Sequence, residues 1–202
     1  LVMKREESIE AEMRQNTNLA RALEEQTLRV LAITDHATIR MRYAIVARGA
    51  ATADEMIRFA NETGIAPKIL AQLSFVDGQG RFVGSNLDPD GSKSGHPDLS
   101  EREHVRVHLK PAAQGPALVS ADGLFIGKPV LGKVSRRWTI QVSRRIVAAD
   151  GATLGVVVAS LDPGYFDEVY RRVSLGAQGS VSLVGQDRTV RARVVGGESA
   201  GM

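Results

Sequence analysis

Uncharged polar side chains alternate with apolar ones along the segment WTIQVSRRIV, residues 138–147. Thr139, Gln141 and Ser143 fall at every second position, so a β-strand would place all three on one face. Hydroxyl and amide groups in such a row can line a pocket and exchange hydrogen bonds with a small molecule. The sequence carries no nucleophile elbow, P-loop, HExxH or paired-carboxylate signature, so the row indicates binding rather than catalysis.

An arginine stands at the predicted start of a helix. Ser100 and Glu103 form a capping box, which predicts a helix over residues 101–110 that Pro111 ends. A guanidinium fork beside the free backbone amides of a helix start is well suited to hold an organic anion. We therefore expect Arg102 to anchor a carboxylate or a phosphate group.

Two histidines on that helix, His104 and His108, lie one turn apart and share a face with Glu101. This arrangement is compatible with zinc. No further ligands are evident and cysteine is absent, so we expect no metal and no cofactor. The histidines would instead line the pocket or pack beside it, where an ordinary pKa would let them titrate near neutral pH.

Other strand residues could also reach a ligand. Lys128 either enters the pocket or points to solvent, and Trp138 either packs in the core or forms the floor of the site. We expect one of Arg144 and Arg145 to form a structural salt bridge, with ligand contact as the alternative. The expected ligand-binding residues are Arg102, His104, His108, Lys128, Trp138, Gln141, Ser143 and Ser160.

The elements that would position these residues form an α+β set. Residues 1–48 contain neither Gly nor Pro and predict one long helix with an imperfect apolar seam. That helix either packs on its own domain or pairs with a second copy. Further predicted elements are a helix from Thr52 to about Asn61, a hairpin at 73–84, an edge strand at 124–130, strands at 138–147 and 154–161, a helix to about Val173, and a hairpin at 179–194.

Composition narrows the class of protein. The 202 residues carry a formal net charge of +3, but basic and acidic residues are interleaved, so we expect no nucleic-acid partner. No apolar run approaches the roughly 20 residues of a membrane-spanning helix. Because the chain starts inside a helical pattern without an initiator Met, we expect a segment of a longer protein.

Five segments resemble, in order, the signatures of Cache domains, which are PAS-like extracytoplasmic sensor modules. The likeness covers most of the chain and is greatest to the double-Cache type of bacterial diguanylate cyclases, histidine kinases and chemoreceptors. The segments are residues 98–108, 124–130, 138–147, 150–170 and 175–193.

The resemblance implies three parts. Residues 1–48 would be a stalk helix that forms a homodimer, and residues 49–173 a membrane-distal lobe whose mainly antiparallel sheet is flanked by helices and binds the ligand. Residues 174–202 would be the start of a small membrane-proximal lobe. The resemblance further implies a periplasmic location, a membrane anchor and a cytoplasmic output domain outside this chain.

Amino-acid-binding members of this family carry Arg-x-Trp-Tyr at the helix start and an Asp on the last core strand that takes the ligand amine. Arg102 matches, but His104 and Val105 replace the aromatic pair and Ser160 stands in place of the Asp. An ammonium group would lack its counter-charge, so we expect a small anionic ligand without an amine. The alternatives are an amino-acid sensor and a ligand-free dimerisation or relay module, whose pocket would be filled by large apolar side chains.

Overall fold

The computed structural model describes residues 2–61, 69–110, 119–173 and 175–200. The chain divides into two compact units, Leu1–Ala32 and Ile33–Met202, and helix α1 (Val2–Arg48) contributes to both. In the first unit, Ile9 and Met13 are exposed apolar side chains. In the second, Met41 and Ile45 of the same helix are fully buried. No helix within the described ranges is both long and apolar enough to cross a membrane.

Helix α2 (Ala53–Asn61) begins with the expected capping box. The Glu55 amide donates to Thr52 Oγ1 at 3.2 Å, and the Glu55 carboxylate accepts from the Thr52 amide at 3.0 Å. These reciprocal bonds satisfy two amides that a helix start would leave free. The helix contacts the first strand of the large sheet and buries Met56 and Phe59.

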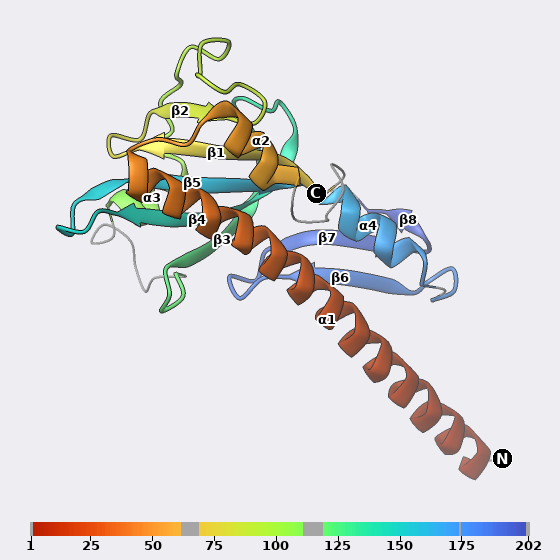
Figure 1. The fold of residues 1–202 in the computed structure, drawn as a ribbon. Helices are drawn as coiled ribbons and strands as arrows, with labels where there is room; N and C mark the ends of the chain where they lie inside the picture. Colours follow the sequence, from red (N-terminus) through yellow and green to blue (C-terminus); the bar gives the residue numbers. More distant parts are fainter. Residues whose placement is uncertain (1, 62–68, 111–118, 174, 201–202) are drawn as a thin grey trace. The chain divides into compact units, whose positions relative to one another are not determined.

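The large sheet has five antiparallel strands and is visible with its helices in Figure 1. Its order is β2 (Phe82–Ser85), β1 (Leu70–Asp77), β5 (Thr153–Leu161), β4 (Trp138–Val147) and β3 (Leu124–Leu131). Strand β5 is central and buried from Gly155 onward, as its nearly continuous apolar sequence predicts. Strand β3 lies at the edge of the sheet, as its Pro129 predicts, because proline cannot donate a backbone hydrogen bond to a second neighbouring strand.

The pairing register places polar side chains in a row across one face of this sheet. Gln72 on β1 and Gln141 on β4 both lie opposite Ser160 on the central strand. In the next row, Ser74 and Ser143 both lie opposite Val158. Helix α3 (Glu103–Leu109) contacts β3, β4 and β5, and all these polar side chains are buried.

Helix α3 begins later than the capping box predicts. Arg102 occupies the N-cap position with extended backbone, and no side chain caps the helix. The Ser100 amide instead donates to Asp98 Oδ1, and the Arg102 amide donates to the Leu99 carbonyl, so a separate turn precedes the helix. The residue expected to end the helix, Pro111, lies outside the described ranges.

Trp138 lies in neither the core nor the sheet's polar row. Its side chain is 55 % exposed, contrary to both readings of its role. It is the first residue of β4 and pairs with Leu131, which is itself exposed at the end of β3. Position at the end of a strand pair therefore decides its environment.

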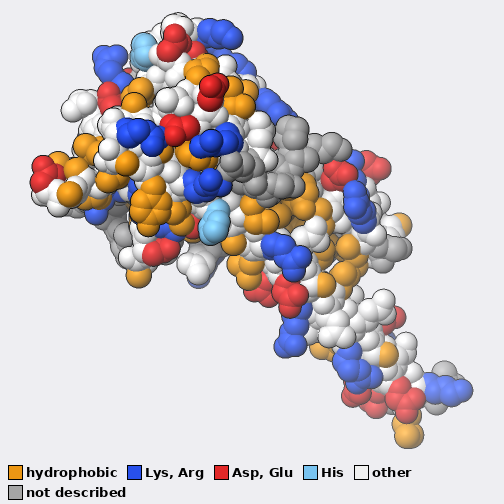
Figure 2. All heavy atoms as spheres, in the orientation of Figure 1, with side chains coloured by type: hydrophobic (Ala, Val, Ile, Leu, Met, Phe, Trp, Pro, Cys, Tyr) orange, Lys and Arg blue, Asp and Glu red, His pale blue; other side chains and the backbone are white. Residues whose placement is uncertain are grey.

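A second sheet follows the large one along the chain. It contains β6 (Ser180–Val184), β7 (Val190–Val195) and the short β8 (Glu198–Ser199), which the sequence pattern does not predict. Helix α4 (Gly164–Arg171) contacts β7 and β8 and buries Phe166 and Tyr170 (Figure 1). On the face of the molecule in Figure 2, basic and acidic side chains are mixed, as the interleaved sequence charges predict.

Candidate functional site

A pocket lies over the polar row of the large sheet. Its empty volume, including the open mouth, is about 420 Å³. The floor is formed by Gln72, Ser74, Gln141 and Ser160, each at most 6 % exposed. Apolar side chains complete the wall: Val76, Phe82, Leu99 and Val158. The strand pairing alone therefore brings four uncharged polar groups from three strands into one concave site.

Part of this floor is held by a chain of hydrogen bonds. The Ser160 hydroxyl donates to Gln141 Oε1 at 2.8 Å, and Gln141 Nε2 donates to Thr139 Oγ1 at 2.7 Å. The side chains of Gln72 and Ser74 make no hydrogen bond to any residue in the described ranges. The unpaired polar atoms of Gln72 and Ser74 are not fully buried, so they keep contact with water that a bound molecule can replace.

His104 adds a neutral imidazole to the pocket. Burial, aided by the nearby Arg102 charge, lowers the pKa of His104 to about 3. Its ring makes no hydrogen bond to another residue that the structure describes. The expectation that it titrates near neutral pH is therefore wrong, because an imidazolium would lose its hydration in this site.

His108 lies beside the pocket rather than in its lining. Its Nε2 is 3.0 Å from the Ser143 hydroxyl, and its ring meets Phe125 edge-on with the centroids 6.4 Å apart. Burial lowers the pKa of His108 to about 4, so it too is neutral at physiological pH. Within the described ranges, no group of three potential metal ligands is present.

Positive charge is confined to the rim. Arg102 is half-buried, while Lys133, in the loop between β3 and β4, is exposed and donates to the Asp98 carbonyl at 2.6 Å. None of the described residues that line the pocket is acidic. The site thus combines a cationic mouth with an uncharged polar floor.

The structure gathers half of the expected site residues. Arg102, His104, Gln141 and Ser160 line the pocket. His108 and Ser143 bond to each other nearby, while Lys128 and Trp138 are exposed outside it.

Sequence reasoning missed Gln72, Ser74 and Lys133. Gln72 and Ser74 alternate with apolar residues in LAQLSFVD, and this alternation is a detectable signal of a strand with one polar face. The predicted strand begins only at residue 73, so it leaves Gln72 out and hides the alternation. Lys133 carries no such signal, because the shape of a hairpin loop decides where it lies.

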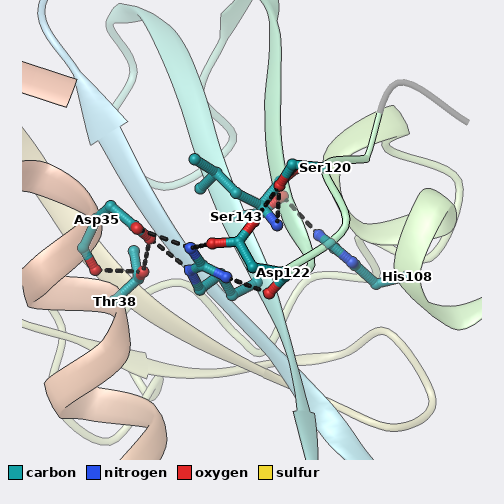
Figure 3. A network of polar contacts seen from close by, with 8 residues as sticks. Asp35, Thr38, His108, Ser120, Asp122 and Ser143 are labelled. Carbon is teal, nitrogen blue, oxygen red and sulfur yellow. Dashed lines mark hydrogen bonds and ion pairs between the residues drawn. The ribbon is translucent and has the colours of Figure 1, made fainter. Parts of the chain in front are cut away.

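Arg144 lies on the opposite face of β4 from Ser143 and is 2 % exposed. Its Nη2 donates to carboxylate oxygens of Asp35 on α1 and of Asp122, both at 2.7 Å. The bond to Asp35 raises the pKa of the guanidinium further. This confirms the expected structural salt bridge, and Figure 3 shows Asp35 on one side of the strand and His108 on the other.

No protein-family model matches this sequence, and no curated protein matches it. Solved structures do match. The extracellular domain of a protein named as a histidine kinase, rpHK1S-Z16, is 24% identical with a TM-score of 0.72, over 92% of this chain and 73% of that one.

Two further solved structures share the architecture. An extracellular ligand-binding receptor from Desulfohalobium retbaense has 14% identity and a TM-score of 0.58, over 76% of this chain and 26% of its own. The ligand-binding domain of the Pseudomonas fluorescens chemoreceptor CtaA, in complex with L-serine, has 19% identity and a TM-score of 0.55, over 84% and 64%. The chain therefore has the fold of the extracellular sensor domains of histidine kinases and chemoreceptors.

Proposed function

We propose that this chain is an extracytoplasmic sensor domain that binds a small anionic metabolite and passes its occupancy to an output domain elsewhere in the protein. The observation that carries this proposal is the pocket over the large sheet, with buried polar groups free on its floor and Arg102 at its mouth. The fold shared with extracellular ligand-binding domains supports it. In this proposal the protein is periplasmic and membrane-anchored, with a histidine kinase, diguanylate cyclase or chemoreceptor output.

The charge of the lining favours an anion without an amine. A carboxylate or phosphate at the mouth would meet the Arg102 fork, which can donate two parallel hydrogen bonds. An ammonium group would find no carboxylate among the described lining residues and would lose hydration without a counter-charge.

An amino-acid ligand is the second candidate function. The CtaA domain of similar fold is in complex with L-serine, an amino acid. In this chain the free acceptors, such as the Gln72 amide oxygen, would have to hold the ammonium without a negative charge. A ligand-free relay module is less well supported, because the floor is polar rather than filled by large apolar side chains.

A thermal-shift screen of the purified chain tests the proposal. We expect at least one member of a panel of carboxylates and phosphate esters to raise Tm, and Arg102→Gln to abolish the rise. Arg171→Gln, at an exposed position on α4, should leave it unchanged. A Tm insensitive to every anion contradicts the proposal, and a rise with amino acids alone supports the second candidate.

The proposal includes pairing of two copies along residues 1–48. Exposed apolar side chains such as Ile9 and Met13 on α1 favour such a contact. Light scattering on the screened samples would measure the molar mass. A monomer at every concentration would contradict the pairing of this chain.

A further inference from the structure

We infer that the ligand is a short hydroxycarboxylate, held with its carboxylate at the rim of the pocket and its hydroxyl on the floor. This inference rests on the proposed function and narrows it to one chemical class. It depends on three features of the described residues: where the charges lie, which floor groups lack a hydrogen-bond partner, and which floor group can only accept a hydrogen bond from the ligand.

The distribution of charge sets the orientation of the ligand. Both cations of the lining, Arg102 and Lys133, lie at the half-buried and exposed rim. The floor holds only amides, hydroxyls and the neutral His104 ring. A second carboxylate placed on that floor would be desolvated without a cation beside it, so a dicarboxylate fits poorly.

Floor groups without a hydrogen-bond partner favour a ligand whose inner end is polar. The Gln72 side chain is 4 % exposed and unpaired within the described ranges. An alkyl chain against it would remove its remaining access to water and leave both of its polar atoms unsatisfied. An amide that is buried without hydrogen bonds opposes binding, so a simple alkyl acid is disfavoured.

The direction of the hydrogen bonds distinguishes a hydroxyl from a ketone. Ser160 donates its proton to Gln141 Oε1, so its oxygen can only accept from the pocket side. The Gln72 amide can both donate and accept. A ligand hydroxyl would donate to Ser160 and accept from Gln72, whereas a ketone oxygen could only accept and would leave the Ser160 oxygen without a donor from the ligand.

A series of acids of equal length tests this inference by calorimetry and Tm. Lactate, pyruvate, propionate, malonate and alanine form the three-carbon set, and 3-hydroxybutyrate, acetoacetate, butyrate and succinate form the four-carbon set. We expect the hydroxy acid of one set to bind about tenfold more tightly than its alkyl counterpart, which corresponds to one satisfied buried group.

A matched pair of variants locates the preference. Gln72→Met preserves side-chain volume and should reduce the preference for the hydroxy acid, without abolishing carboxylate binding at Arg102. Gln79→Met makes the same substitution at an exposed turn position and should leave the preference unchanged. Retention of the full preference in Gln72→Met would overturn the assignment of Gln72.

The outcomes separate this inference from the proposed function. Equal binding of hydroxy and alkyl acids, or tightest binding of a dicarboxylate, overturns the inference and leaves an anion sensor standing. The same holds if no acid of the series binds while another anion of the broader panel raises Tm. A chain that binds no anion in either experiment overturns the proposed function as well.

Discussion

His104 and His108 lie one helical turn apart on α3 but have different surroundings. His104 opens onto the pocket, while His108 is held by Ser143 and packed against Phe125. Both are neutral because burial opposes protonation. Their pKa values lie below that of a histidine in the unfolded chain. As the pH falls, these histidines therefore become protonated in the unfolded chain before they do so in the folded chain, and the folded chain loses stability.

The first prediction concerns this loss of stability in acid. The stabilising effect of neutral His108 is complete above pH 6.5, its unfolded pKa, and is lost as the pH falls toward its folded pKa of about 4. Between pH 7.0 and 5.5, the free energy of unfolding should fall by about 1 kcal/mol more in the natural chain than in His108→Gln. Urea unfolding at both pH values measures this difference.

An exposed histidine supplies the control. His36→Gln makes the same substitution at an exposed position of α1 and should leave the acid sensitivity of the natural chain unchanged. If His108→Gln lost as much unfolding free energy between pH 7.0 and 5.5 as the natural chain does, the pKa of His108 would not be lowered by burial.

At the scale of elements, β4 joins two helices that lie on opposite sides of it. Consecutive residues of a strand point to opposite faces, so Ser143 bonds to His108 on α3 while Arg144 bonds to Asp35 on α1 (Figure 3). Asp35 is 109 positions from Arg144 in sequence. The ion pair thus fixes the second unit's part of α1 to the large sheet.

Replacing Arg144 should destabilise this arrangement. Arg144→Met leaves the Asp35 carboxylate, whose side chain is only 15% exposed, without its cation, and we expect a loss of about 3 kcal/mol in unfolding free energy. Arg145→Met alters the next, exposed residue and should change stability little.

Asp122→Asn should also have a small effect, because the Asp122 side chain is 67% exposed. Chemical denaturation measures all three, and equal losses in Arg144→Met and Arg145→Met would contradict the structural role of the pair.

The sequence predicts those elements whose signals are local. Alternation along residues 138–147 and the apolar run after Thr153 predict β4 and β5, and the Thr52–Glu55 box predicts the start of α2. The partnership of Arg144 with Asp35 has no local signal, because only the tertiary fold brings the two residues together. For the same reason, the sequence predicts a polar face on β4 around Gln141, but it does not show that Gln72 of β1 lies in the same row of the sheet, on the other side of Ser160.

At the scale of the second unit, Arg191 on β7 connects the small sheet to the large one. Its side chain is buried, and its Nε and Nη2 donate to the Gly127 and Ile126 carbonyls of β3 at 3.1 and 3.2 Å. Its Nη1 donates to Asp187 at 2.8 Å, and this bond lowers the pKa of Asp187 to about 2. The contact falls where the register of β3 against β4 shifts, between Ile126 and Pro129. The same strand supplies Val130 and Leu131 to the pocket, so the small sheet and the pocket share one edge strand.

Loss of this arginine should therefore affect both sheets. Arg191→Met leaves the half-buried Asp187 carboxylate without its cation and two β3 carbonyls without their donor, and we expect a loss of about 3 kcal/mol in unfolding free energy. Hydrogen exchange should accelerate in Leu124–Leu131 as well as in Val190–Val195, because the bonds that hold the two strands together are gone. Arg193→Met, two residues along the same strand but exposed, is the matched control and should preserve both stability and exchange rates. Faster exchange confined to the small sheet would mean that Arg191 stabilises only its own hairpin, and that β3 keeps its position without it.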